Sequence, residues 1–163
     1  MAWSVRARTS SADATRDLAA RLAQAARLGD VIVLRGGLGA GKTTFAQGFA
    51  RGLGVEGPVT SPTFTLVRQY PCALGQLVHV DVYRLDHLAE VADLGLADLV
   101  EDGLAIVEWG DVARPALGPV TWTVSIAREG DCADSSGDDE RVLTVHGDDE
   151  ARREEVAAAM KAA

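Results

Sequence analysis

Residues 31–45 read VIVLRGGLGAGKTTF, an apolar run followed by a glycine-rich loop that ends in Gly-Lys-Thr. Positions Gly36 to Thr43 fit the pattern G-x-x-x-x-G-K-T, and the flanking residues predict a strand before it and a helix after it. Such a loop surrounds phosphate oxygens with backbone N–H groups, while the N-terminus of the next helix faces the anion. The stretch therefore predicts a strand–loop–helix unit that binds a nucleoside triphosphate. A flexible Gly-rich turn before Lys-Thr is the alternative.

The residues of this loop have separate expected roles. We expect Lys42 to reach the β- and γ-phosphates and the Thr43 hydroxyl to coordinate Mg²⁺. Glycines would permit positive φ angles and let the backbone wrap closely around phosphate, at Gly36, Gly37, Gly39 and Gly41. The nucleotide-binding residues predicted from the loop are Gly37, Leu38, Gly39, Ala40, Gly41, Lys42, Thr43 and Thr44.

Short apolar runs alternate with helical patterns on both sides of the loop. Strands are expected over residues 3–7, 31–34, 65–70, 76–83, 104–109, 121–128 and 141–147, and helices over 14–29, 43–54, 86–102 and 148–163. Ser10, Ser11 and Asp13 are candidate caps of the first helix, and Gly95 is expected to break the third. This order predicts one α/β domain over residues 1–163. Its expected form is a P-loop NTPase-type three-layer sandwich with a largely parallel central sheet and an antiparallel hairpin from 65–70 and 76–83.

Composition and charge limit the class of protein. The chain has 163 residues and a net charge of -8, and an acidic balance disfavours direct binding to nucleic acid. No apolar run is long enough to cross a membrane, and the first residues lack the apolar centre of a signal peptide, so we expect a cytoplasmic protein. Residues 129–140 are polar and acidic, and we expect a mobile loop there.

Two acidic residues end apolar strand-like runs, where α/β sheets place their ligands. Asp81 follows LVHV, and Glu108 follows LAIV in the form of a Walker B strand. Mg²⁺ needs carboxylate as well as phosphate oxygens, so either acid is a candidate metal ligand, and Glu108 could orient the attacking water. A solvated carboxylate at a strand end is the alternative for each.

The segment after the second predicted helix carries a cluster of hydroxyl groups. Thr60, Ser61 and Thr63 surround Pro62 in a stretch that reads TSPTF to Phe64. In P-loop switch proteins the corresponding loop senses the γ-phosphate, so this segment is a candidate switch-like loop. An ordinary capping turn fits the same residues.

Three classes of P-loop protein compete. A guanine-specific switch protein needs Asn-Lys-x-Asp or Thr-Lys-x-Asp, and the chain has no asparagine and only two lysines, Lys42 and Lys161. A small-molecule kinase usually closes an arginine-bearing lid over the phosphates, and Arg114 is the only arginine between Leu85 and Ala127. An ATPase whose nucleotide state regulates a partner needs only the loop, a metal site and a movable surface. A non-catalytic ATP sensor is a further reading.

Several segments together resemble one family. GGLGAGKTTFAQGFARGLG, VTSPTFTLV, HVDVYRL, DLGLADL and IVEWGD occur in the order and approximate spacing found in TsaE, formerly called YjeE, across residues 10–127. That family is a small bacterial ATPase required for threonylcarbamoyladenosine at position 37 of tRNA. The chain departs from the common family pattern at Gly37 and at Gly110–Asp111, where Asp and Pro-Glu are usual.

The resemblance implies roles for particular residues. Lys42 and Thr43 would be the phosphate and Mg²⁺ residues, and Asp81 and Glu108 the acids needed for metal binding and hydrolysis. Trp109 would border the nucleotide, with core packing as the alternative reading of its position. The resemblance also implies ATP and Mg²⁺ as cofactors and the TsaB and TsaD proteins as partners. ATP hydrolysis would reset the TsaB–TsaD pair. The chain would contact tRNA only indirectly, through that complex.

Overall fold

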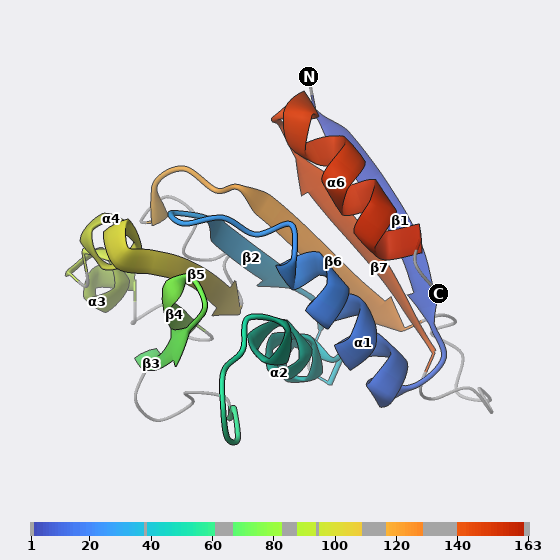
Figure 1. Cartoon of the computed structure of the whole chain (residues 1–163), viewed down its shortest axis with the longest axis horizontal. Helices are drawn as coiled ribbons and strands as arrows, with labels where there is room; N and C mark the ends of the chain where they lie inside the picture. The colour runs from blue at the N-terminus through green and yellow to red at the C-terminus, as the bar shows by residue number, and fades with distance from the viewer. Residues whose placement is uncertain are drawn as a thin grey trace.

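Seven strands form one sheet in the part of the chain that the computed structural model describes, residues 2–37, 39–60, 67–82, 88–93, 95–108, 117–128 and 140–161. The strands are β1 (Trp3–Thr9), β2 (Val31–Arg35), β3 (Val67–Cys72), β4 (Gly75–Asp81), β5 (Gly103–Glu108), β6 (Trp122–Arg128) and β7 (Arg141–Gly147). Their order across the sheet is β1-β7-β6-β2-β5-β4-β3 (Figure 1). β2, which leads into the glycine-rich loop, therefore lies at the centre.

The sheet is mixed, and the prediction of a largely parallel sheet is confirmed only for its four central strands, β6, β2, β5 and β4. β2 runs parallel to both β5 and β6, and β4 runs parallel to β5. The pairs β1–β7, β6–β7 and β3–β4 are antiparallel. The predicted hairpin is confirmed as β3–β4, but β7 and β1 extend the other side of the sheet with a second antiparallel part. Their alternating burial fits strands that have one face open to water.

The helices are α1 (Ala12–Ala23), α2 (Lys42–Gly52), α3 (Leu88–Asp93), α4 (Leu96–Leu99) and α6 (Glu150–Lys161), with a 3-10 turn at Val100–Asp102. Ser11 caps α1, because its Oγ accepts a hydrogen bond of 3.0 Å from the backbone N–H of Ala14. The expected break at Gly95 is confirmed, since this residue has a φ of 62° at the start of α4. None of the described helices is long and apolar enough to cross a membrane.

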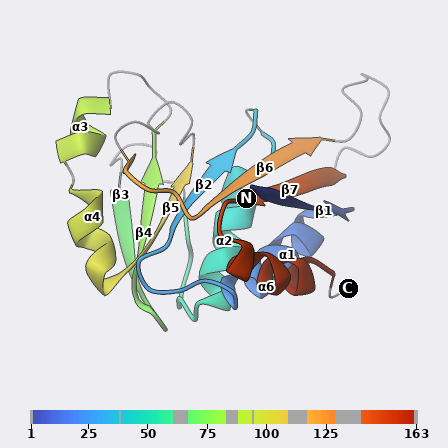
Figure 2. The same ribbon diagram turned by 90° about the horizontal axis from the view of Figure 1, so that it is seen from above.

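The central strands are buried on both faces, as their continuous apolar runs predict. α1, α2 and α6 cover one face (Figures 1 and 2), where Ile32 and Ile106 share a core with Phe45 and Phe49 of α2. Alternate strand residues such as Val33 and Val107 form a second core on the other face, together with residues of α4 and the 3-10 turn. The sheet thus lies between two layers, and α2 is the helix that follows the glycine-rich loop.

A buried ion pair joins α6 to the residue before β2. Arg152 donates from Nη1 to Asp30 Oδ1 at 3.1 Å and from Nη2 to Asp30 Oδ2 at 2.7 Å. Nη2 also donates to the carbonyl of Ala25 at 2.8 Å, and the guanidinium lies 5.0 Å from the ring centre of Trp122. These contacts fix the last helix against the sheet.

Candidate functional site

The glycine-rich loop connects the end of β2 to the start of α2, and its glycines serve different purposes. Gly39 and Gly41 have φ angles of 76° and 110°, which glycine adopts without strain. Gly36 does not have a positive φ; a Cβ there would lie 2.7 Å from the carbonyl oxygen of Ile126 on β6. Gly37 has neither a positive φ nor an atom within 4 Å of an added Cβ. The prediction of positive φ is therefore wrong for Gly36 and Gly37, and Gly36 is needed for close contact with a neighbouring strand.

Lys42 is the first residue of α2 and reaches back over the loop. Its Nζ donates hydrogen bonds of 2.8 Å to the carbonyl of Gly36 and 2.9 Å to that of Gly37. Burial lowers the pKa of Lys42, while the negative charges of Glu108 and Asp81 act in the opposite direction. The loop therefore holds a partly desolvated ammonium group, which attracts an anion more strongly than a hydrated one does.

Two arginines hold the same loop from the ends of neighbouring strands. Arg128 of β6 donates to the carbonyl of Gly39 at 3.2 Å, and Arg141 of β7 donates to the carbonyl of Ala40 at 2.8 Å. The two residues are opposite each other in the β6–β7 pair. Sequence analysis gave them no role, because each is an isolated arginine in a strand and only the strand pairing brings it to the loop. The C=O and N–H groups of a trans peptide point in opposite directions, so the bond from Arg141 also sets the orientation of the Gly41 N–H.

The two predicted acids lie side by side at the carboxyl ends of parallel strands. Asp81 ends β4 and is opposite Glu108, which ends β5 and is in turn opposite Leu34 of β2. Both acids are buried, with exposed fractions of 5% and 2%. The structure therefore brings them together beside the loop, as expected for the ligand-binding edge of an α/β sheet.

Both oxygens of the Glu108 carboxylate have a partner. Oε1 accepts a hydrogen bond of 3.2 Å from the Thr43 hydroxyl on α2. Oε2 lies 2.6 Å from Nε2 of His79, a residue of β4 that has no exposed surface. Sequence analysis missed His79. The available signal was a polar residue inside the buried run LVHVD, two positions before Asp81 and thus on the same face of the strand.

The donor set suits a magnesium ion that also binds phosphate. Thr43, Asp81 and Glu108 offer hydroxyl and carboxylate oxygens, the hard ligands that Mg²⁺ prefers. Among the described residues, no group of three His, Cys, Asp or Glu side chains could hold a metal ion without other ligands. The residues present therefore fit a Mg²⁺ ion completed by substrate oxygens, and they do not form an all-protein metal centre.

Other predicted site residues are only partly described. Thr44 is half-buried on α2, and Thr60 is exposed after a segment held by a hydrogen bond of 3.1 Å from Gln47 of α2 to the Val59 carbonyl. Leu38, Ser61, Pro62, Thr63 and Trp109 lie outside the described residues, as do residues 110–111 and 129–139. The expected switch-like loop, nucleotide-bordering tryptophan and mobile acidic loop therefore stay predictions.

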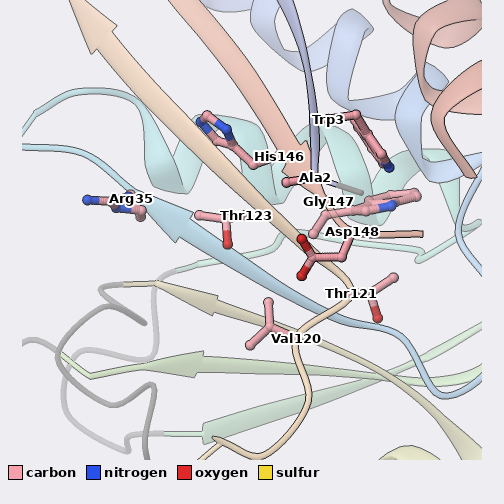
Figure 3. A pocket seen from close by; sticks show the side chains of 10 residues that line it. Ala2, Trp3, Arg35, Val120, Thr121, Thr123, His146, Gly147 and Asp148 are labelled. Atoms are coloured by element: carbon pink, nitrogen blue, oxygen red, sulfur yellow. The ribbon is translucent and has the colours of Figure 1, made fainter. Parts of the chain in front are cut away.

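A separate hollow of about 210 Å³ lies on the sheet face that α1 and α6 leave open. Figure 3 shows Arg35, Thr123, His146 and Asp148 around it, from β2, β6, β7 and the turn after β7. It contains none of the residues that contact Glu108 or the carbonyls of the glycine-rich loop. The carboxylates and Lys42 therefore mark the candidate site, and this hollow does not.

Comparisons with known proteins point to one family. A family model described as threonylcarbamoyl adenosine biosynthesis protein TsaE matches residues 9–135. A Bacillus subtilis protein named tRNA threonylcarbamoyladenosine biosynthesis protein TsaE is 41% identical over 138 residues, which is 84% of this chain and 82% of that protein. A Streptomyces coelicolor protein of the same name is 51% identical over 100 residues, covering 59% of this chain and 67% of its own.

A solved structure agrees with this result. The crystal structure of Bacillus subtilis YdiB matches with a TM-score of 0.77 and 33% sequence identity. The match covers 98% of this chain and 95% of that one, so the similarity extends over the whole fold.

Proposed function

This chain belongs to the TsaE family of threonylcarbamoyladenosine biosynthesis proteins, and from that membership we propose that it is a P-loop ATPase that binds ATP and Mg²⁺ and supports this modification of tRNA. The observation that carries the proposal is the meeting of the glycine-rich loop, Lys42 and Thr43 with the buried Asp81 and Glu108 at one edge of the sheet. These groups match the parts that phosphoryl transfer to water requires, which supports the proposal. They come from three different segments of the chain.

The loop and Lys42 would bind the phosphates of ATP. The ammonium of Lys42 now donates to the carbonyls of Gly36 and Gly37, and it would exchange these for oxygens of the β- and γ-phosphates. The backbone N–H groups of the loop and of the first turn of α2 would supply further donors. Gly37, Leu38, Gly39, Ala40, Gly41, Thr44 and Trp109 complete the proposed nucleotide site.

Thr43, Asp81 and Glu108 would hold Mg²⁺. The ion would neutralise charge that develops on the phosphate oxygens during transfer. Glu108 is also buried at the end of a central strand and fixed through both oxygens, which suits a carboxylate that orients an attacking water. The switch-like segment Thr60–Thr63 would report the state of the γ-phosphate to a partner.

The proposed partners are the TsaB and TsaD proteins, and ATP hydrolysis would reset their complex between turnovers. The net charge of -8 is compatible with action on a protein partner and disfavours direct capture of tRNA. A small-molecule kinase was the main alternative. It receives no support from Arg128 and Arg141, because both arginines donate to carbonyls of the glycine-rich loop.

Steady-state ATP hydrolysis tests the proposal. The purified chain is measured alone and with the TsaB–TsaD pair of its own organism. We expect slow turnover alone and a large increase with the pair. Equal turnover in both would contradict the proposed partners, and no turnover in either would contradict the ATPase. Transfer of phosphate to a metabolite in the absence of the pair would establish a kinase instead.

A further inference from the structure

We propose that His79 is a positioning residue that fixes the carboxylate of Glu108 in the orientation needed for hydrolysis. This inference rests on the proposed ATPase function, since it assigns a role to a residue behind the same site. The contact is short and shielded from water. The Nε2–Oε2 distance is 2.6 Å, and the side chains of His79 and Glu108 are 0% and 3% exposed.

The direction of this hydrogen bond follows from the chemistry of its partners. An ionised carboxylate only accepts hydrogen bonds, so His79 Nε2 carries the proton and donates it. The Thr43 hydroxyl donates to the other oxygen of Glu108. With one donor on each oxygen, the plane of the carboxylate is set by a residue of the sheet on one side and a residue of α2 on the other.

The strand register explains how His79 reaches Glu108. His79 is directly opposite Ile106, and Asp81 is directly opposite Glu108. The imidazole therefore contacts Glu108 diagonally, from a position on β4 two residues before Asp81. From this position His79 contacts Glu108 from the buried side of the sheet. The carboxyl ends of the strands, where Thr43 and Lys42 lie, stay open for the phosphates.

Packing alone does not account for a histidine at this position. Among the described residues, His79 Nδ1 is buried and has no hydrogen-bond partner. A buried polar atom without a partner is unfavourable, and an apolar side chain would avoid that penalty. The surrounding residues of β4 and β5, such as Leu77 and Ile106, are apolar and fully buried. An apolar residue could not form the hydrogen bond to Glu108, and this bond accounts for the histidine at position 79.

The test compares three substitutions of His79. In His79→Gln the amide nitrogen can lie near the position of Nε2 and still donate. In His79→Asn the side chain is one methylene shorter and cannot reach Glu108, and His79→Leu has no donor. We expect kcat to fall about 10- to 100-fold in His79→Asn and His79→Leu, as is typical when a residue that orients a ligand is lost. KM for ATP should stay within about twofold, and His79→Gln should recover most of the loss.

A second set of measurements separates positioning from a general effect on folding. In a Glu108→Gln background, His79→Asn should cause no further loss of kcat, because the two residues act as one unit. Additive losses in the double variant would overturn the proposal, as would full activity of His79→Asn. Thermal melting of every variant shows whether it is folded. If His79→Leu fails to fold, the comparison of Gln with Asn decides the question.

A measurement without ATP keeps this inference distinct from the proposed function. The imidazole ¹⁵N and N–H resonances of His79, assigned by their loss in His79→Gln, should show a protonated Nε2 whose shift changes in Glu108→Gln. If the wild-type chain hydrolyses no ATP but shows this signature, the ATPase proposal fails and the hydrogen bond stands. An unprotonated Nε2 would overturn the inference whatever the rate of ATP hydrolysis. The same holds if the His79 resonances have the same shift in Glu108→Gln as in the wild type.

Discussion

Thr43 at the start of α2 and Glu108 at the end of β5 are 65 residues apart in the chain and meet through a hydrogen bond of 3.2 Å. One residue follows the glycine-rich loop, and the other ends a central strand. Their contact links the part of the site that would bind phosphate to the part that would act on water. Phosphate binding and action on water can therefore be tested separately, by substitutions on either side of this contact.

Glu108→Gln should slow ATP hydrolysis and leave ATP binding nearly intact. The substitution keeps the volume of the side chain but removes the negative charge. Loss of a group that assists proton transfer typically costs about 10²- to 10⁴-fold in rate, and we expect kcat to fall within that range. Glu101→Gln is the matched control, because Glu101 is exposed on the 3-10 turn before β5. Unchanged turnover in Glu108→Gln would remove Glu108 from the mechanism.

Lys42→Ala should abolish measurable ATP binding. The variant loses charge-assisted hydrogen bonds to phosphate, each worth about 1.5–3 kcal/mol, so two such bonds correspond to an affinity loss on the order of 10²- to 10⁴-fold. Isothermal titration with ATP and Mg²⁺ measures the loss. The chain offers one other lysine, and Lys161→Ala near the exposed end of α6 should bind as the wild type does. Equal affinity of both variants would contradict the role of Lys42.

Gly36→Ala and Gly37→Ala should differ strongly although the residues are adjacent. A Cβ at Gly36 would lie 2.7 Å from the Ile126 carbonyl, whereas one at Gly37 would have no atom within 4 Å. Overpacking of this kind typically costs about 1–3 kcal/mol, so Gly36→Ala should lower the free energy of unfolding and distort the loop. Equilibrium urea unfolding and ATP titration of the two variants test this. Equal free energies of unfolding for the two variants would show that the Ile126 carbonyl of β6 moves away to accommodate the added methyl group.

Arg152→Met should destabilise the fold because it leaves Asp30 buried without its main partner. Removing one member of a buried ion pair typically costs about 3–5 kcal/mol. The neighbouring Arg153 is about half exposed and lies 4.0 Å from Glu150, so Arg153→Met should change the free energy of unfolding by less than about 0.5 kcal/mol. Urea unfolding of both variants measures the difference. A small effect of Arg152→Met would mean that Asp30 is satisfied by other contacts, such as the Arg27 N–H at 2.7 Å.

The lowered pKa of Lys42 predicts a pH dependence of stability. In the unfolded chain Lys42 returns to its ordinary pKa of 10.5, so between the lowered pKa and 10.5 the unfolded state binds more protons than the folded state. The free energy of unfolding of the wild type should therefore rise with pH in this range, relative to that of Lys42→Met. Lys161→Met, as the control, should keep the wild-type slope. Parallel curves for wild type and Lys42→Met would mean that the pKa is not lowered.

Local patterns in the sequence predicted the elements and much of the site. The apolar run of β2, the glycine-rich loop and the acids at two strand ends depend on neighbouring residues, and each lies where these residues indicate. The pairing of β1 with β7 was missed because periodicity within a strand does not tell which distant strand lies beside it. Arg128, Arg141 and His79 were missed for the same reason, since each acts on a residue of another segment.

The pairing of the first strand with the last has a consequence for how the chain is made. Thr9 of β1 is opposite Arg141 of β7, roughly 130 residues later, and β1 pairs with no other strand in the described sheet. At about 5–20 residues per second, a ribosome needs roughly 7–26 s to bridge that interval. During that time β1 has no strand of the described sheet to pair with. The contact from Arg141 to the carbonyl of Ala40 in the glycine-rich loop also waits for β7. The opening strand and the glycine-rich loop therefore reach their final contacts only after the last strand has been made.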